Sequence, residues 1–305
     1  MTEQIPYMLG CRISELSGTR VPVFQGALPG FSGPELAAAV SDAGGLGHIG
    51  GCFSQAEDVR LAIEQVRRLT AKPFGVYLIP QHSDHTTFRT CLKEVIKERP
   101  QILTLCYGYY GDAIRKARAA GICVAVQVRS QAEARMALRD GAQILIAQGE
   151  EAAGYIPGQI GLMALLPELI ALAGDVPVMA AGSVHDCHSV RGLMAMGAAG
   201  VWCTAGFAVC HESSAGKKVK QRLLSAETGS ERLCCEPVPD VEQQAPSPHK
   251  TLRQNSLLRR FLSSSAEKNH TDQHPLRFYW GQGLGQISKA QPAAQLVAEL
   301  AKGFR

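Results

Sequence analysis

The stretch ICVAVQVRSQAEARMALRDGAQILIAQ, residues 122–148, carries the pattern on which the fold prediction rests. Its first part, ICVAVQ, predicts a buried strand, and SQAEARMALRDG predicts an amphipathic helix that ends at Gly141. The run QILIAQ then predicts a second strand. A strand, a helix and a strand in this order are typical of one unit of a parallel sheet.

The same unit repeats from about residue 20 to about residue 225. The other strand candidates are VPVFQ at Val21, LGHIG at Leu46, FGVYLI at Phe74, ILTLC at Ile102, VPVMAA at Val176 and GVWCTA at Gly200. Eight strands that alternate with eight helices predict an α/β fold, a TIM-like (β/α)8 barrel, because eight parallel strands close such a barrel. An open doubly wound sheet is the competing architecture, although no G-x-G-x-x-G motif follows the first strand.

The composition changes after the barrel pattern ends. Residues 1–226 are expected to form the barrel, and residues 227–274, rich in Pro, Ser and Gln, a loop or partly disordered insertion. Residues 275–305 end in the amphipathic pattern PAAQLVAELAKGF, so we expect this C-terminal segment to pack on the barrel with a closing helix.

The net charge and the spacing of the cysteines exclude some classes of protein and of site. The 305 residues carry a net charge of +4, which is too weakly basic to indicate nucleic-acid binding. We expect no signal peptide and no membrane span, because no apolar run reaches about 20 residues. The ten cysteines form no C-x-x-C pair, which indicates reduced thiols in a cytoplasm and no metal site. The sequence indicates no particular oligomeric state.

Small residues mark the loops where a barrel holds its ligand. Gly182-Ser183 follows the seventh strand, and Thr204-Ala205-Gly206 follows the eighth. Barrels bind phosphate at these two loops through backbone N–H groups, so we expect a phosphate site there, although ordinary tight turns are the alternative. The first-strand loop, residues 26–30, has little side-chain bulk and offers a flat backbone surface. Together these features suggest FMN.

Several segments, in order along the chain, resemble the nitronate monooxygenase (2-nitropropane dioxygenase-like) family, which is related to FMN-dependent enoyl-acyl-carrier-protein reductases. They include PVFQGALPG, AGGLG at residues 43–47, KPFGVYL, AQGEEAAGY, PVMAAGSV, GAAGVWCTAGF and YWGQGLGQI. The resemblance implies an FMN-binding TIM barrel and an oxidoreductase that acts on a small molecule. The FMN contacts that we expect from it and from the loop pattern are Gly26, Ala27, Leu28, Tyr77, Gln148, Gly154, Gly182, Ser183, Trp202, Cys203, Thr204 and Ala205.

The chain departs from the family pattern at the positions that would face the flavin. Tyr155 stands where the family has its catalytic histidine, Tyr77 where the third strand usually has asparagine, and Cys106 where many members have histidine. The motif after the eighth strand, usually Gln-x-Gly-Thr-Arg-Phe, reads WCTAGF at residues 202–207.

These departures leave several functions open. A phenol is a poor base at pH 7 but a reasonable proton donor, and a nitronate has already lost the proton that the histidine would remove. We expect an FMN-dependent enzyme that oxidises alkyl nitronates with flavin and oxygen, with Tyr155 at the catalytic position. The alternatives are an enoyl-thioester reductase with Tyr155 as donor, a degenerate barrel that only binds, with Tyr155 as a packing ring, and a flavin-free phosphate-sugar enzyme. The last should show paired carboxylates, which only Glu150 and Glu151 approach.

Histidines near the predicted mouth leave room for a base elsewhere. His82, His85, His185 and His188 fall in mouth loops, where we expect solvent-exposed side chains, and His185 falls beside the predicted phosphate site. His48, on the second strand, is expected to face the mouth.

Overall fold

The computed structural model describes most of the chain, and the structural statements below concern the described residues. These are residues 12–27, 31–51, 53, 55–80, 85–108, 111–154, 158–228 and 279–305. Leu28, His82 and Tyr155 lie outside them, as does nearly all of the predicted insertion.

Eight parallel strands form a closed sheet, which confirms the barrel and rules out the open doubly wound alternative. They are β1 (Val23–Gln25), β2 (Gly47–Gly51), β3 (Phe74–Leu78), β4 (Ile102–Leu105), β5 (Cys123–Val128), β6 (Ile144–Gln148), β7 (Val178–Ala181) and β8 (Gly200–Cys203). Each strand from β2 to β7 pairs with the next one along the chain, and β8 pairs with β1. A parallel bridge between Phe24 and Leu46 closes the remaining gap.

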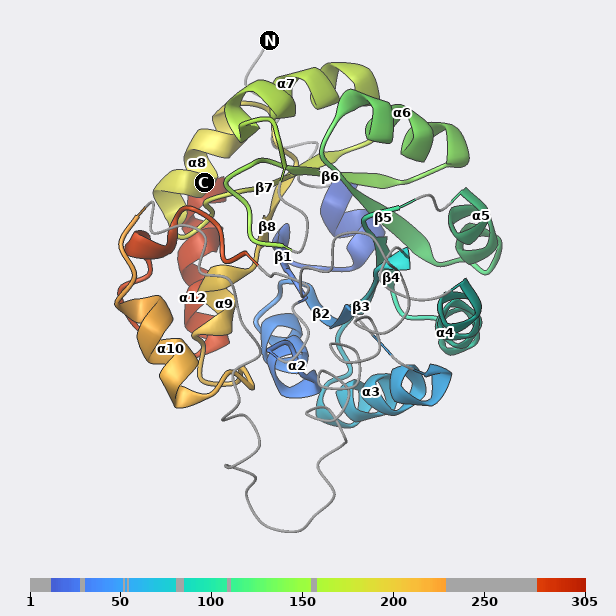
Figure 1. Ribbon diagram of the computed structural model, residues 1–305, viewed down its shortest axis with the longest axis horizontal. Coiled ribbons are helices and arrows are strands. Elements are labelled where there is room, and N and C mark those ends of the chain that lie inside the picture. Colours follow the sequence, from blue (N-terminus) through green and yellow to red (C-terminus); the bar gives the residue numbers. More distant parts are fainter. Residues whose placement is uncertain are drawn as a thin grey trace, which may run out of the picture.

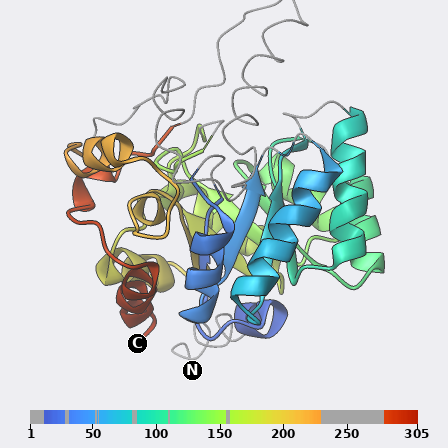
Figure 2. The same cartoon turned by 90° about the horizontal axis from the view of Figure 1, so that it is seen from below.

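Helices surround the barrel as a ring (Figure 1). Those between strands are α2 (Pro34–Asp42), α3 (Ala56–Leu69), α4 (His85–Glu98), α5 (Gly111–Ala119), α6 (Gln131–Asp140), α7 (Leu162–Ala173) and α8 (Cys187–Ala195). After β8 come α9 (Ala205–Ala208), α10 (Lys217–Leu224), η3 (Leu284–Gln286), α12 (Ala293–Ala301) and η4 (Lys302–Phe304). The helix α12 lies between α8 and α2 (Figures 1 and 2), so the C-terminal segment supplies the eighth member of the ring.

Local signals in the sequence place the helix ends. The Ser130 side chain caps α6 by accepting a hydrogen bond from the Glu133 backbone N–H, and Gly141 ends the helix with a left-handed φ of 98°. The Asp186 and Ser189 side chains form a capping box at the start of α8. These caps fix the start and end of α6 and the start of α8.

The strands separate two apolar layers. Side chains that point outward, such as Leu103 and Leu105 of β4, pack against the helices, whereas their neighbour Ile102 points into the barrel. Ile13, from the helical residues 12–17, joins the inner layer. The remaining inner apolar residues on or beside the strands are Phe24, Leu46, Tyr77, Ile79, Cys106, Cys123, Ala125, Ile144, Ile146, Met179, Ala181, Ala199 and Trp202.

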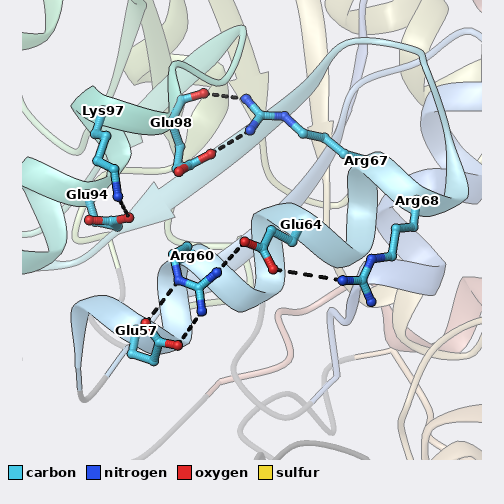
Figure 3. A network of polar contacts seen from close by, with 8 residues as sticks. All are labelled: Glu57, Arg60, Glu64, Arg67, Arg68, Glu94, Lys97 and Glu98. Carbon is cyan, nitrogen blue, oxygen red and sulfur yellow. Dashed lines mark hydrogen bonds and ion pairs between the residues drawn. The ribbon is translucent and has the colours of Figure 1, made fainter.

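Charged side chains line the outer faces of α3 and α4 (Figure 3). Within α3, Arg60 binds both Glu57 and Glu64, and Arg67 reaches across to Glu98 of α4, with Nη1 2.5 Å from Oε2. Exposed pairs of this kind contribute little to folding, because water and salt screen their charges. They therefore help to align the two helices more than they stabilise the barrel.

His48 is fully buried in the barrel interior, not at the mouth where we expected it. Its ring centroid lies 5.7 Å from that of Phe24 and 4.9 Å from that of Trp202, and its Nε2 lies 3.0 Å from Thr104 Oγ1. Among the described residues, nothing forms a hydrogen bond with its Nδ1. Burial lowers the pKa of His48 to about 3, because a charged ring would lose its hydration there. The ring is therefore neutral at pH 7.

This burial predicts a specific dependence of stability on pH. The ordinary histidine pKa is 6.5, whereas the pKa of His48 in the folded barrel is about 3, so between these values the unfolded chain binds one more proton. His48 should therefore lower the free energy of unfolding as the pH falls through the range from 6.5 to about 3, by up to about 1.4 kcal/mol per pH unit. Replacing His48 with Gln should remove this part of the acid slope, measured by urea unfolding between about pH 5 and pH 7. The exposed His85→Gln variant should keep the wild-type slope, and an unchanged slope in His48→Gln would contradict the assignment.

Candidate functional site

The carboxyl ends of the strands form the mouth of the barrel, and a chain of hydrogen bonds crosses its inner wall. Tyr77 Oη donates to Gln127 Oε1 over 3.1 Å, and Gln127 Nε2 donates to Gln148 Oε1 over 2.8 Å. All three side chains are buried. The Gln148 amide is thereby held in one orientation, because its oxygen faces a fixed donor.

Gly154 packs closely against this wall. A Cβ atom on Gly154 would lie 2.4 Å from Tyr107 Oη and 3.2 Å from Gln148 Nε2. A larger residue here would displace the ends of the Tyr107 and Gln148 side chains, so glycine lets the loop after β6 lie against them undisturbed. Two of the expected contact residues, Gln148 and Gly154, are adjacent in space for this reason.

Trp202 forms the floor of the mouth together with Tyr77. The two ring centroids are 5.7 Å apart, and the indole lies directly above the buried His48. A Cβ atom on Gly26 would lie 2.6 Å from Trp202 Nε1 and 2.1 Å from Thr204 Oγ1, so the ends of β1 and β8 meet here. The floor is well covered, because Ala27, Tyr77 and Trp202 are each at most 5% exposed.

A pocket runs from this floor toward the loops after β7 and β8. Its lining includes Ala181 and Trp202 at the inner end and Ser183, His185 and Ala205 at the outer end. Gly182 has a φ of 154° and Ser183 a left-handed φ of 48°, which turns the chain sharply at the start of the loop. The pocket therefore connects the aromatic surface that is expected to contact the flavin ring with the loops that are expected to bind its phosphate.

Four backbone amides at the outer end have no hydrogen-bond acceptor within the described part of the chain. They belong to Ser183 and Val184 in one loop and to Thr204 and Ala205 in the other. Successive free N–H groups in such turns form a concave site that favours an anion. All four residues line the same pocket, so the two loops offer their N–H groups to one shared space.

The C-terminal segment forms one wall of the pocket. Tyr279 pairs with Gly154 through two backbone hydrogen bonds of 2.9 Å, and the Gln282 N–H donates to the Glu151 carbonyl over 3.0 Å. The Glu151 carboxylate in turn accepts from the Leu162 N–H at the start of α7, with N–O distances of 3.0 and 3.1 Å. Glu151 thus joins the loop after β6, α7 and residues 279–287, whereas Glu150 is exposed.

Cys203 contributes to the site through its backbone alone. Its Sγ is buried and donates to the Val184 carbonyl over 3.2 Å, on the far side of the strand from Trp202. Burial raises the pKa of Cys203 to about 12, so the thiol stays protonated at pH 7. It is not a nucleophile in this position.

The structure brings most of the expected contact residues into two adjoining groups. Gly26, Ala27, Tyr77, Gln148, Gly154 and Trp202 surround the floor, and Gly182, Ser183, Cys203, Thr204 and Ala205 surround the outer end of the pocket. Leu28 and the expected catalytic Tyr155 lie outside the described residues. Tyr155 directly follows Gly154, whose place is known.

Gln127 was not among the expected contact residues, and His185 is more buried than expected. Gln127 occupies an inward position of β5, two residues after Ala125, and this alternation is the signal that would have identified it. His185 was expected to be exposed, but its side chain is only 20% exposed and lines the pocket. His85 and His188 are exposed, as expected.

Within the described residues, no helix is long and apolar enough to span a membrane, and no group of three or more His, Cys, Asp or Glu side chains is arranged to hold a metal ion.

Known proteins resemble this chain over most of its length. A family model described as nitronate monooxygenase matches residues 11–236. A nitronate monooxygenase from Pseudomonas aeruginosa is 33% identical over 256 residues, which cover 70% of this chain and 73% of that protein. A (3aS,4S,5R,7aS)-5-hydroxy-7a-methyl-1-oxo-octahydro-1H-indene-4-carboxyl-CoA dehydrogenase from Rhodococcus jostii is 32% identical over 213 residues, 70% of this chain and 59% of that protein. The structure of FabK from Thermotoga maritima, 27% identical, superposes with a TM-score of 0.78 over 96% of this chain and 95% of that one. The chain belongs to the nitronate monooxygenase family.

Proposed function

We propose that this protein is an FMN-dependent oxidoreductase that oxidises alkyl nitronates or closely related small anions. The observation that carries the proposal is the pocket in which four acceptor-free amides of Ser183, Val184, Thr204 and Ala205 adjoin the aromatic floor at Trp202. A phosphate at the outer end and a flat ring at the inner end match the two parts of FMN. Membership of the nitronate monooxygenase family supports the same cofactor and reaction class.

The residues present fit the phosphate end of FMN through backbone groups and the ring end through side chains. Gly182 and Ser183 would hold the phosphate, Gly26 and Ala27 would lie along the ring, and the fixed Gln148 amide would offer a hydrogen bond to a ring heteroatom. Bound FMN supplies the two-electron acceptor of the reaction. The covered floor beneath it would keep water away from the reacting face.

Tyr155 is the group that we expect to face the substrate, from its position directly after Gly154. The phenol of tyrosine has an ordinary pKa of about 10, so it donates a hydrogen bond or proton at neutral pH and does not remove a proton from carbon. A nitronate needs no such base, because it is already the conjugate base of the nitroalkane. The proposed substrate preference is therefore for preformed nitronates over neutral nitroalkanes.

A reductase acting on an enoyl thioester is the second candidate. It is favoured by the resemblance of the sequence motifs to FMN-dependent enoyl-acyl-carrier-protein reductases, and by the similarity to the Rhodococcus jostii dehydrogenase, whose name gives a coenzyme A thioester as its substrate. Such a reaction needs a proton donor beside the flavin, and Tyr155 has the right chemistry for that role. Rates on a nitronate and on an enoyl thioester with NADH or NADPH separate the two candidates.

The phosphate placement predicts how flavin content responds to two substitutions at Ser183. The purified protein should be yellow and release FMN on denaturation. Ser183→Glu should remove the flavin, because a carboxylate at the pocket wall repels the phosphate. Ser183→Ala should retain it, because the backbone amide and not the hydroxyl contacts the phosphate. Flavin content per chain, read from the visible absorbance, checks both, and equal retention in the two variants would refute the placement. A wild-type chain that never binds flavin would instead favour a barrel that only binds other molecules.

The assignment of Tyr155 predicts a selective loss of rate. Tyr155→Phe should lower a reductive reaction by about 10²- to 10⁴-fold, the usual contribution of one positioned proton donor, with little change in flavin content. Tyr155→His should raise turnover of neutral nitroalkanes, because imidazole is a base near pH 7. Initial rates of the wild type and of both variants on nitronate, nitroalkane and enoyl thioester test these two expectations. If wild type and Tyr155→Phe react equally fast on every substrate that is turned over, Tyr155 has only a packing role.

A further inference from the structure

The outer end of the pocket contains one histidine that no part of the proposed reaction uses. His185 lies directly after the Ser183-Val184 turn, and its side chain is 20% exposed. Within the described residues its Nδ1 is buried and has no hydrogen-bond partner. A buried ring nitrogen that lacks a partner costs free energy, which a ligand with a matching acceptor would recover.

Charge around the outer end makes this histidine distinctive. Among the described residues that line the pocket, His185 is the one side chain able to carry a positive charge, and Glu151 is the one carboxylate. A phosphate monoester carries a charge of about −1.5 to −2 near neutral pH. Four amide dipoles alone would leave much of that charge uncompensated, so a cation at this wall would strengthen binding.

We propose that His185, in its protonated form, donates a hydrogen bond to the phosphate of bound FMN and makes cofactor affinity depend on pH. This inference rests on the FMN binding proposed above. It assigns His185 a binding role that does not involve the reacting atoms. Binding of the dianion and protonation of His185 favour each other, so the cofactor is held more tightly when the ring is charged.

The neighbouring charges are compatible with this role. The ionisable side chains around His185 are Glu151 in the pocket, Asp186 and His188 at the start of α8, and Lys289, Glu299 and Lys302 in the adjoining cavity. Most of them are already engaged. The Glu151 carboxylate accepts from the Leu162 N–H, and Lys302 Nζ lies 2.6 Å from Glu299 Oε2.

Asp186 is the acidic group nearest to the ring. Its Oδ1 lies 3.9 Å from His185 Nε2, and the same carboxylate is fixed by a 2.7 Å hydrogen bond from the Ser189 N–H at the start of α8. The Asp186 carboxylate is therefore within ion-pair distance of the ring. His185 would therefore lie between a fixed carboxylate on one side and the phosphate on the other.

The test is the dissociation constant of FMN, measured by flavin fluorescence on the full chain between about pH 5.5 and pH 8.5. The wild type should bind FMN about 10- to 100-fold more tightly than His185→Gln at the acidic end, the contribution of one charge-assisted hydrogen bond. The ratio should approach one at the alkaline end, where imidazole is neutral. Ionisation of the phosphate itself affects both proteins alike and cancels in the ratio.

Three controls make the result specific. His188→Gln, an exposed histidine of the same region, should bind FMN like wild type at every pH. Riboflavin, which lacks the phosphate, should bind wild type and His185→Gln equally. His185→Lys, which keeps its charge throughout this range, should bind FMN tightly without the loss at alkaline pH.

The outcomes separate this inference from the proposed function. If FMN binds but His185→Gln loses the same factor at all pH values, or loses riboflavin equally, His185 has a structural role and the inference is overturned. If neither FMN nor riboflavin binds the wild type, both the inference and the proposed function fail.

Discussion

The seam between β1 and β2 is the constraint on which the rest of the structure depends. The Leu46 N–H donates to Val23 O and the Gln25 N–H to Leu46 O, both over 2.9 Å. Beyond these two bonds a side chain continues the ladder, because Gln25 Oε1 accepts from the His48 N–H over 2.9 Å. Without this closure the sheet would be open between β1 and β2, because the other seven strand pairs do not join these two strands.

Close packing at the seam explains the glycines of residues 43–47. A Cβ atom on Gly47 would lie 2.0 Å from the Ala37 carbonyl oxygen, so α2 can approach β2 this closely only at glycine. The position of Gly47 beside α2 also sets which residue of β2 points into the barrel. His48, the next residue, points inward by strand alternation and is buried as a neutral ring beneath Trp202. A polar group at the centre of the barrel is thus a consequence of how the seam is packed.

The sequence predicted the barrel well because its signals are local. Apolar runs gave the eight strands, and residues such as Ser130 and Gly141 gave the ends of α6. The contacts that depend on closure were not predictable in this way. The hydrogen bond from Gln127 to Gln148 and the depth of His48 depend on which side chains meet across a closed interior, which no single strand reveals.

The C-terminal segment also makes contacts that its sequence pattern does not predict. Its amphipathic pattern predicted a helix that packs on the barrel, but not that α12 would lie between α8 and α2 as the eighth member of the ring. Nor did it predict that Gln282 would bind the Glu151 carbonyl and so form a wall of the pocket. Glu151 matched the family motif by letter, and its role as the link between α7 and this wall became visible only in three dimensions.

The two ends of the pocket carry different kinds of information about function. At the outer end the amides of Ser183, Val184, Thr204 and Ala205 face the pocket, and backbone groups remain when side chains change. A change of side chain in these two loops therefore leaves their backbone N–H groups in place. At the inner end the departures at Tyr77 and Trp202 are changes of buried side chains whose rings lie 5.7 Å apart, so they change the surface itself. Family membership therefore supports the class of cofactor more strongly than it supports the reaction, and the identity of the substrate depends on the few side chains above the floor.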